Sequence, residues 1–296
     1  MGTGNIKGDE MGGIIGFRKV GDEDNISFEI SRLVYAVDIR KNGTAHVMIE
    51  GMVTAGQTSE PFNTIELMIP HNSVLNIEDK TETFLDKNIK ENLYRSEYSL
   101  VDKNKKIVLL SGIKVKIVPI DLRVEEREGY TSIFINFRSP IRKGETKVFR
   151  IIYDIKNFAL KIRSNKYGYE NFIIDIGFYD RSMIEHGNID NSKIVSCKRI
   201  HVWIAFPYDF EILDTSHYQT KRKWDEYFLS GGKKDNYSKI LLSWKFDEFR
   251  PWNFTRRLLL RLRRNFLGII DLLGVIGFAV SVILAGIELF LLFGGG

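Results

Sequence analysis

The residues able to carry nucleophilic or acid–base chemistry are few and scattered in this 296-residue sequence. The single cysteine, Cys197, is followed by two cations and lies four positions before His201. Neighbouring cations lower the pKa of a thiol and make it a nucleophile. In a strand, however, residues four apart share one face at a separation of about 13 Å, too far for a thiolate–imidazole pair. A small residue packed on a strand is the alternative interpretation.

Other catalytic or metal-binding patterns are absent from the sequence. Asp175 interrupts the apolar run NFIIDIGFYD, as a buried catalytic acid would, although such a residue more commonly faces solvent or caps a turn. The five histidines have no spacing typical of metal ligands; they are His46, His71, His186, His201 and His217. P-loop, G-x-G-x-x-G, G-x-S-x-G and H-E-x-x-H motifs do not occur. We therefore expect no catalytic residue, cofactor or metal.

A dispersed active site stays open as an alternative, because the members of a catalytic triad need not be adjacent in sequence. In that case the chain is a membrane-tethered hydrolase. Its site would be assembled from Asp175, His186, Cys197 and His201.

The C-terminal segment 266–293 points instead to a membrane. It reads FLGIIDLLGVIGFAVSVILAGIELFLLF and contains only two charges, Asp271 and Glu288. A helix of this length spans about 42 Å, against a hydrocarbon core of about 30 Å. The sequence therefore predicts a single transmembrane helix over 266–293. A shorter span, 272–287, with both acids at the interfaces, is the alternative.

One face of this helix favours self-association. Small and polar residues fall within about 80° of one another on a helical wheel, and an acid lies at one edge of the stripe. The stripe comprises Gly274, Gly277, Ser281, Ala285 and Glu288, with Asp271 at its edge. Small residues let helices approach closely in lipid, and acids there tend to face partners or water. We expect a homo-oligomer through this face, with Glu288 in an interhelical hydrogen bond or lining a pore.

Basic residues precede the helix. Segment 251–265 is predicted to be a basic juxtamembrane linker, and its arginines are Arg256, Arg257, Arg261, Arg263 and Arg264. A second basic run, Lys221, Arg222 and Lys223, is either a solvated loop or a contact with an anionic leaflet of the lipid bilayer. The net charge of +5 becomes +2 for residues 1–254 once the +5 of the arginines and the −2 of the helix are removed. We therefore expect no nucleic-acid partner.

The position of these arginines also predicts the topology. Arginines beside a membrane helix prefer the cytoplasm, and here they lie on the side of the larger domain. The first 25 residues contain no apolar stretch of signal-peptide length. We expect a single-pass C-terminal anchor with a cytoplasmic domain; an exported domain is the alternative.

Between Ser27 and Phe249 the dominant hydrophobic period is two, as in Phe149–Lys156 and Ile240–Phe246. Strands with one buried and one polar face favour antiparallel sheets. Asn42-Gly43 between two such runs is typical of a hairpin. Helical periodicity is limited to Thr83–Arg95, and His217–Leu229 is either a helix or a loop. The fold class is therefore mainly β, an antiparallel β-sandwich, either one large sandwich or two packed ones.

The domain organisation follows from breaks in this pattern. Residues 1–25 are glycine-rich and acidic and are predicted to be a flexible lead. Residues 26–157 form a β-sandwich domain, and 158–250 form a second β-rich domain or continue the first. The function predicted is a membrane-anchored, non-catalytic binding or sensing protein whose β domain binds an unknown protein or small molecule. Its helix serves either an adaptor or a membrane-permeabilising effector.

Overall fold

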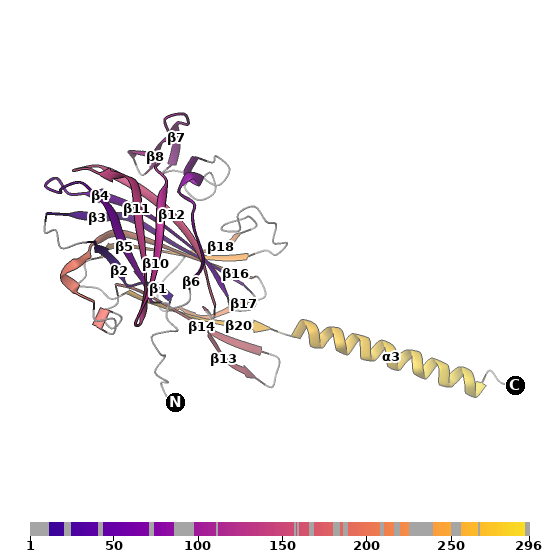
Figure 1. The fold of residues 1–296 in the computed structure, drawn as a ribbon. Helices are drawn as coiled ribbons and strands as arrows, with labels where there is room; N and C mark the ends of the chain where they lie inside the picture. Colours follow the sequence, from indigo (N-terminus) through magenta and orange to yellow (C-terminus); the bar gives the residue numbers. More distant parts are fainter. Residues whose placement is uncertain are drawn as a thin grey trace.

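The structure is a computed structural model of the chain. It describes residues 12–20, 25–40, 44–70, 74–85, 98–110, 112–156, 158, 160–165, 169–179, 184–185, 189–207, 210–215, 220–224, 239–249, 256–265 and 267–293. Strands dominate, and a single long helix, α3 (Leu267–Phe293), leaves the β domain at one end (Figure 1). The prediction of a mainly β, largely antiparallel fold is confirmed.

The largest sheet, sheet C, has seven strands. Its order is β18 (Thr220–Trp224), β19 (Lys239–Phe249), β16 (Cys197–Pro207), β3 (Phe28–Ile39), β4 (Ala45–Ala55), β12 (Thr146–Ile155) and β6 (Val74–Asp79). β3 and β4 pair antiparallel, as the Asn-Gly signal between them predicts, although residues 41–43 lie outside the described part of the chain. β16 and β3 pair in parallel, which joins the segments predicted as two domains within one sheet.

Two five-stranded sheets contribute to the same core. Sheet A has the order β1 (Gly12–Ile14), β14 (Tyr169–Phe178), β20 (Arg256–Asn265) and β17 (Phe210–Thr215), with β13 (Leu160–Asn165) paired to β14. Sheet B has the order β10 (Ile120–Arg127), β11 (Tyr130–Ile141), β5 (Phe62–Ile69), β2 (Gly16–Lys19) and β15 (Ile194–Val195). Residues of sheets A, B and C, such as Ile174, Ile65 and Tyr35, belong to one cluster of buried side chains. The core is therefore continuous across residue 158.

The predicted N-terminal lead is in part structural. Residues 12–14 and 16–19 are strands β1 and β2, and they connect sheet A to sheet B. Ile14 and Phe17 are fully buried, which explains why this glycine-rich segment is held in the core. Gly13 has a positive φ of 115°, and a Cβ there would lie 1.9 Å from the carbonyl oxygen of Gly177. Only glycine permits this close approach of β1 to β14.

A small sheet packs on the outer face of sheet C. Sheet D consists of β7 (Tyr98–Asp102), β8 (Ile107–Leu110) and β9 (Ile113–Lys116). With the 3₁₀ helix η2 (Thr81–Leu85), it forms a second buried cluster that includes Phe84, Val108, Met52 and Val148. Of the predicted helix Thr83–Arg95, the described part is thus a 3₁₀ turn that ends at Leu85. In Figure 1, sheet D lies at the end of the β domain away from α3.

Candidate functional site

The segment before the helix is a strand and not a linker. β20 pairs along its whole length with β14, from Arg256 opposite Phe178 to Asn265 opposite Tyr169. Its other neighbour is β17. Leu258, Leu260 and Leu262 are buried in the core and alternate with residues on the other face of the sheet. The prediction of a juxtamembrane linker over 251–265 was therefore wrong for 256–265, because the leucines at alternate positions are buried.

Three of the five arginines of β20 have an acidic register partner in a neighbouring strand. Arg263 is the register partner of Glu211, Arg261 of Asp214, and Arg264 of Glu170. Directly opposed charges of unlike sign stabilise a sheet and reduce the net charge of its face. The side chains of Arg256, Arg257 and Arg264 lie outside the described residues, as do those of Lys221, Arg222 and Lys223 in β18.

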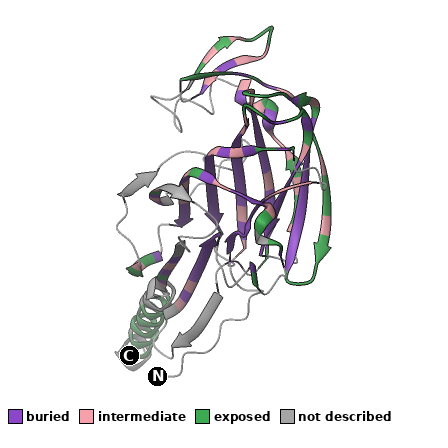
Figure 2. Cartoon of the chain, turned by 90° about the vertical axis from the view of Figure 1, so that its left-hand side faces the viewer, coloured by how far each residue is buried: buried purple, intermediate pink, exposed green. Residues whose placement is uncertain are grey.

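Helix α3 begins after a single residue, Phe266, that follows β20. Its described large hydrophobic side chains are 49–73% exposed, and the ribbon of these residues is coloured as exposed in Figure 2. They are Leu273, Ile276, Phe278, Val280, Val282, Ile283, Leu284 and Ile287. Counting only described residues, the structure contains no helix with both the length and the apolar character that a membrane crossing needs.

The predicted association face of α3 is open in the single chain. Gly274, Gly277, Ser281, Ala285 and Glu288 are all exposed, and a Cβ placed on either glycine meets no atom within 4 Å. Ser281 Oγ donates to the carbonyl of Gly277 at 2.9 Å, so its hydroxyl is satisfied within the helix. The side chain of Asp271 lies outside the described residues. Self-association through this face stays a prediction.

The candidate hydrolase residues are not assembled into a site among the described residues. Cys197 is fully buried in the core, and burial raises the pKa of its thiol, the reverse of what a nucleophile needs. Ile200 and Val202 point into the core, so His201 between them faces the other side of sheet C. Asp175 lies in sheet A and is 2% exposed, so it is buried and does not face solvent. His186 is outside the described residues.

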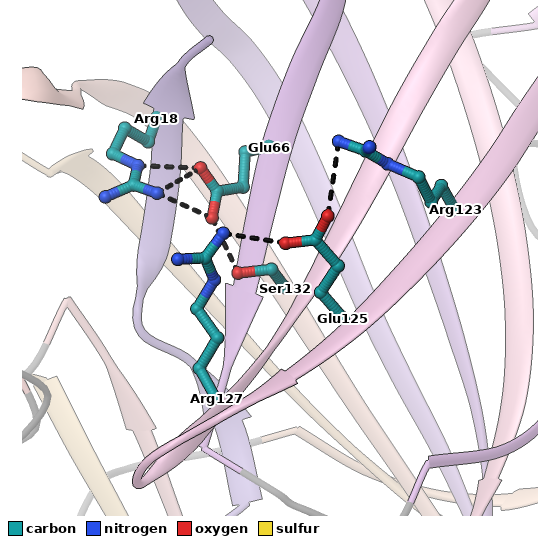
Figure 3. A network of polar contacts seen from close by, with 6 residues as sticks. All are labelled: Arg18, Glu66, Arg123, Glu125, Arg127 and Ser132. Carbon is teal, nitrogen blue, oxygen red and sulfur yellow. Dashed lines mark hydrogen bonds and ion pairs between the residues drawn. The ribbon is translucent and has the colours of Figure 1, made fainter.

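A polar network on sheet B, which the sequence analysis did not identify, surrounds two carboxylates (Figure 3). Glu66 is buried, and it accepts from Arg18 Nε and Nη2 at 2.6 and 2.9 Å and from Ser132 Oγ at 2.6 Å. Beside it, Arg127 Nη2 donates to Glu125 at 2.7 Å, and Arg123 lies within 3.4 Å of the same carboxylate. Both carboxylates are already neutralised by arginine, which is typical of a stabilising network.

A second polar cluster lies on sheet C, where side chains of the neighbouring strands β4, β12 and β6 meet. His46 Nδ1 lies 2.8 Å from Asp154 Oδ1, and Asn76 Nδ2 donates to Asp154 Oδ2 at 3.1 Å. Arg40 is 3.9 Å from the same carboxylate. Partial burial raises the pKa of Asp154, but the hydrogen bonds from His46 and Asn76 outweigh it, so the net shift of this pKa is downward. Among the described residues, no three His, Cys, Asp or Glu side chains form a group that could hold a metal ion.

An open groove of ≈ 430 Å³ lies beside η2. Its lining residues are Asp79, Lys80, Glu82, Thr83, Pro119 and Arg138. Asp79 is engaged by the backbone N–H groups of Thr81 and Ile120, at 2.7 and 3.2 Å, and Arg138 by Asp121 at 2.9 Å. The charged groups of Asp79 and Arg138 are therefore already hydrogen-bonded within the chain and are not available to a ligand without breaking these bonds.

Comparison with known proteins leaves the family open. No family model matches the chain, and no curated protein matches it. Among solved structures, an M1 zinc metallopeptidase from Deinococcus radiodurans has a TM-score of 0.38 and 10% identity over 83% of this chain. The chain spans 43% of that protein's length. Baculovirus P35 has a TM-score of 0.26 and 9% identity over 78% of this chain and 96% of its own.

Proposed function

We propose that this protein is a β-sandwich binding module attached to a lipid membrane through α3. One observation carries the proposal: the large hydrophobic side chains of α3 project freely, at 49–73% exposure. Contiguous exposed apolar surface of this kind belongs to a membrane or to a protein interface.

The distribution of these side chains favours lipid. Val282, Ile283 and Leu284 follow one another at 100° intervals, so apolar groups point in widely separated directions around the helix axis. A helix that is apolar all round is typical of a core or membrane helix, whereas a helix that docks on a protein groove has one apolar stripe. The sequence of 266–293, with Asp271 and Glu288 as its two charges, has the length that a bilayer requires.

The attachment would place the rest of the chain close to the bilayer. Arg261 and Arg263 lie near the end of β20, shortly before α3, and both are at least partly accessible to solvent. Each basic residue near an anionic leaflet contributes about 1 kcal/mol, less where acids such as Glu211 and Asp214 lie opposite. The proposal retains a cytoplasmic β domain that binds a ligand, with its output through the membrane helix.

The experiment is flotation with phosphatidylcholine vesicles. We expect the full chain to float with the vesicles and to resist carbonate extraction, and a chain ending at Asn265 to remain at the bottom. A full-length Val280→Asp/Ile283→Asp variant provides a matched control, because it keeps the helix but adds two charges. Equal flotation of all three proteins would refute attachment through α3.

Two further readouts separate an anchor from an effector. Dye release from vesicles by the full chain, lost in Glu288→Gln, would support a permeabilising oligomer; retention of dye would support a simple anchor. Crosslinking tests the helix face, because Gly277→Leu with Ser281→Leu should abolish oligomers if helices pack there. For a cytoplasmic β domain, we expect a cysteine introduced at Gly129 to be labelled only after the cells are permeabilised.

A further inference from the structure

Sheet D has two faces of different character. Val108, Leu110 and Val115 point inward and pack with Met52 and Val148 of sheet C. The residues between them face outward, because side chains alternate along a strand. Ile107 pairs with Lys116, and Leu109 pairs with Lys114, so these four residues share the outer face.

The outer face of sheet D is strongly basic. Lys114 and Lys116 of β9 lie on it and are exposed, and Lys103 and Lys105 in the adjoining β7–β8 turn are exposed as well. Within the described part of the chain none of these four lysines forms an ion pair. Lys106 differs, since its Nζ lies 2.6 Å from Glu82.

Two features hold this face in a fixed shape. The carboxylate of Asp102 accepts the backbone N–H groups of Asn104 and Lys105 at 2.9 and 3.0 Å, which orders the turn that carries two of the lysines. The N–H of Ile117 donates to the carbonyl of Lys106 at 2.8 Å and ties the end of β9 to the same turn. The lysines are therefore presented by an ordered turn and by strand β9.

Apolar groups lie among these charges. Ile107 and Leu109, the register partners of Lys116 and Lys114, are half-buried on this face. Lys114 and Lys116 are two positions apart on one strand, so their Cα atoms are separated by about 6.6 Å. Acidic side chains two positions apart on an extended peptide have the same spacing.

We propose that the outer face of sheet D binds an acidic, extended polypeptide segment of a partner protein. Acidic side chains of the segment pair with Lys114 and Lys116, and its apolar side chains contact Ile107 and Leu109. This inference rests on the proposed function in one respect, because it names a partner for the binding module.

Other anionic partners fit the observations less well. The described side chains of this face include no arginine and no aromatic ring, the groups that read bases or stack on them. Sheet D is also well separated from α3 in both views, so the proposed partner is a protein and not the bilayer that would hold α3 (Figures 1 and 2).

The test measures fluorescence anisotropy of a labelled peptide of four Glu-Val repeats with the full chain in nonionic detergent. We expect saturable binding that weakens as salt rises. Lys114→Glu with Lys116→Glu should raise the Kd about tenfold, as expected for losing two exposed ion pairs. The matched control is Lys143→Glu with Lys156→Glu, which changes the net charge equally at exposed sites elsewhere.

Three results would overturn the proposal: no saturable binding of the peptide, equal weakening in both double variants, or capture of phosphatidylserine vesicles by sheet D in place of the peptide. If the Glu variants fail to fold, Lys114→Gln with Lys116→Gln removes the same charges more mildly. Because this assay uses no membrane, failure of vesicle flotation would refute the proposed attachment and leave the peptide result standing.

Discussion

The buried ion pair between Glu50 and Arg150 offers the sharpest test of how the β domain is held together. The two side chains are 2% and 3% exposed, on adjacent strands β4 and β12. Arg150 donates to Glu50 Oε2 from Nε at 3.0 Å and from Nη2 at 2.6 Å. It also donates to Thr83 Oγ1 at 2.6 Å, and its Cζ lies 4.1 Å from the ring centroid of Phe84.

The perturbation is Arg150→Met. Water cannot replace the guanidinium at a site so well buried, so Glu50 would lose both charge-assisted hydrogen bonds from Arg150; breaking a buried ion pair by removing one partner costs about 3–5 kcal/mol. Loss of the bond to Thr83 and of the stacking on Phe84 adds about 1–2 kcal/mol. Since whole domains are stable by roughly 5–15 kcal/mol, the variant should be close to unfolding.

The companion variant is Glu50→Leu with Arg150→Met, which removes both charges. It should cost less than the single variant, about 1–2 kcal/mol for the lost contacts with Thr83 and Phe84, because neither charge of this pair remains. Urea unfolding of the full chain in detergent, followed by tryptophan fluorescence, measures both. Hydrogen exchange at Val108 and Leu110 should rise first, since Phe84 packs with them.

The reasoning would be refuted if Arg150→Met cost less than about 1 kcal/mol, or if the double variant were no more stable than the single one. Glu50→Leu alone completes the cycle and gives the coupling energy of the pair.

Three further predictions concern other parts of the β domain. Because the pKa of Asp154 is lower in the folded chain, its ionised form stabilises the fold at pH values above the ordinary carboxyl pKa of about 4, and this contribution is lost as pH falls through the folded-state pKa. Urea titrations should therefore give a lower free energy of unfolding at pH 3 than at pH 5. Asp154→Asn should remove this part of the pH dependence. Iodoacetamide should label Cys197 at pH 8 only in urea, whereas fast labelling of the folded chain would contradict its burial. Gly13→Ala should destabilise the fold by more than about 3 kcal/mol, because the added Cβ would collide with the backbone of β14. Gly129→Ala, at a φ of 81° but with no atom near its Cβ, should cost about 1–2 kcal/mol. Equal costs, measured by urea unfolding, would argue against the close approach of β1 to β14.

Local pattern was enough to predict strands such as β4 and β12. β4 and β12 have one face in the core, and their period of two is visible without knowledge of their neighbours. The same rule applies to β20. Its five arginines favoured a basic juxtamembrane linker, although the alternation of Leu258, Leu260 and Leu262 is typical of a strand. Here the alternation was the correct signal.

Pairing between distant segments could not be predicted. The parallel pairing of β16 with β3 depends on the packing of the whole core, since nothing in either strand specifies its partner. For the same reason Glu66 and Arg18, 48 positions apart, and Glu50 and Arg150, 100 apart, give no local sign of their contact. Lys114 and Lys116 are visible in the sequence, but only the structure shows that they share a face with Ile107 and Leu109.

The direct passage from β20 into α3 determines how mechanical load would enter the domain. A force pulling on α3 acts along β20, whose residues Arg256–Asn265 pair one by one with Phe178–Tyr169. Hydrogen bonds between antiparallel strands run perpendicular to the strand axis, so such a force shears all of them together and cannot break them one at a time. Tension at α3 would therefore be borne by the interior of sheet A and not by an edge strand.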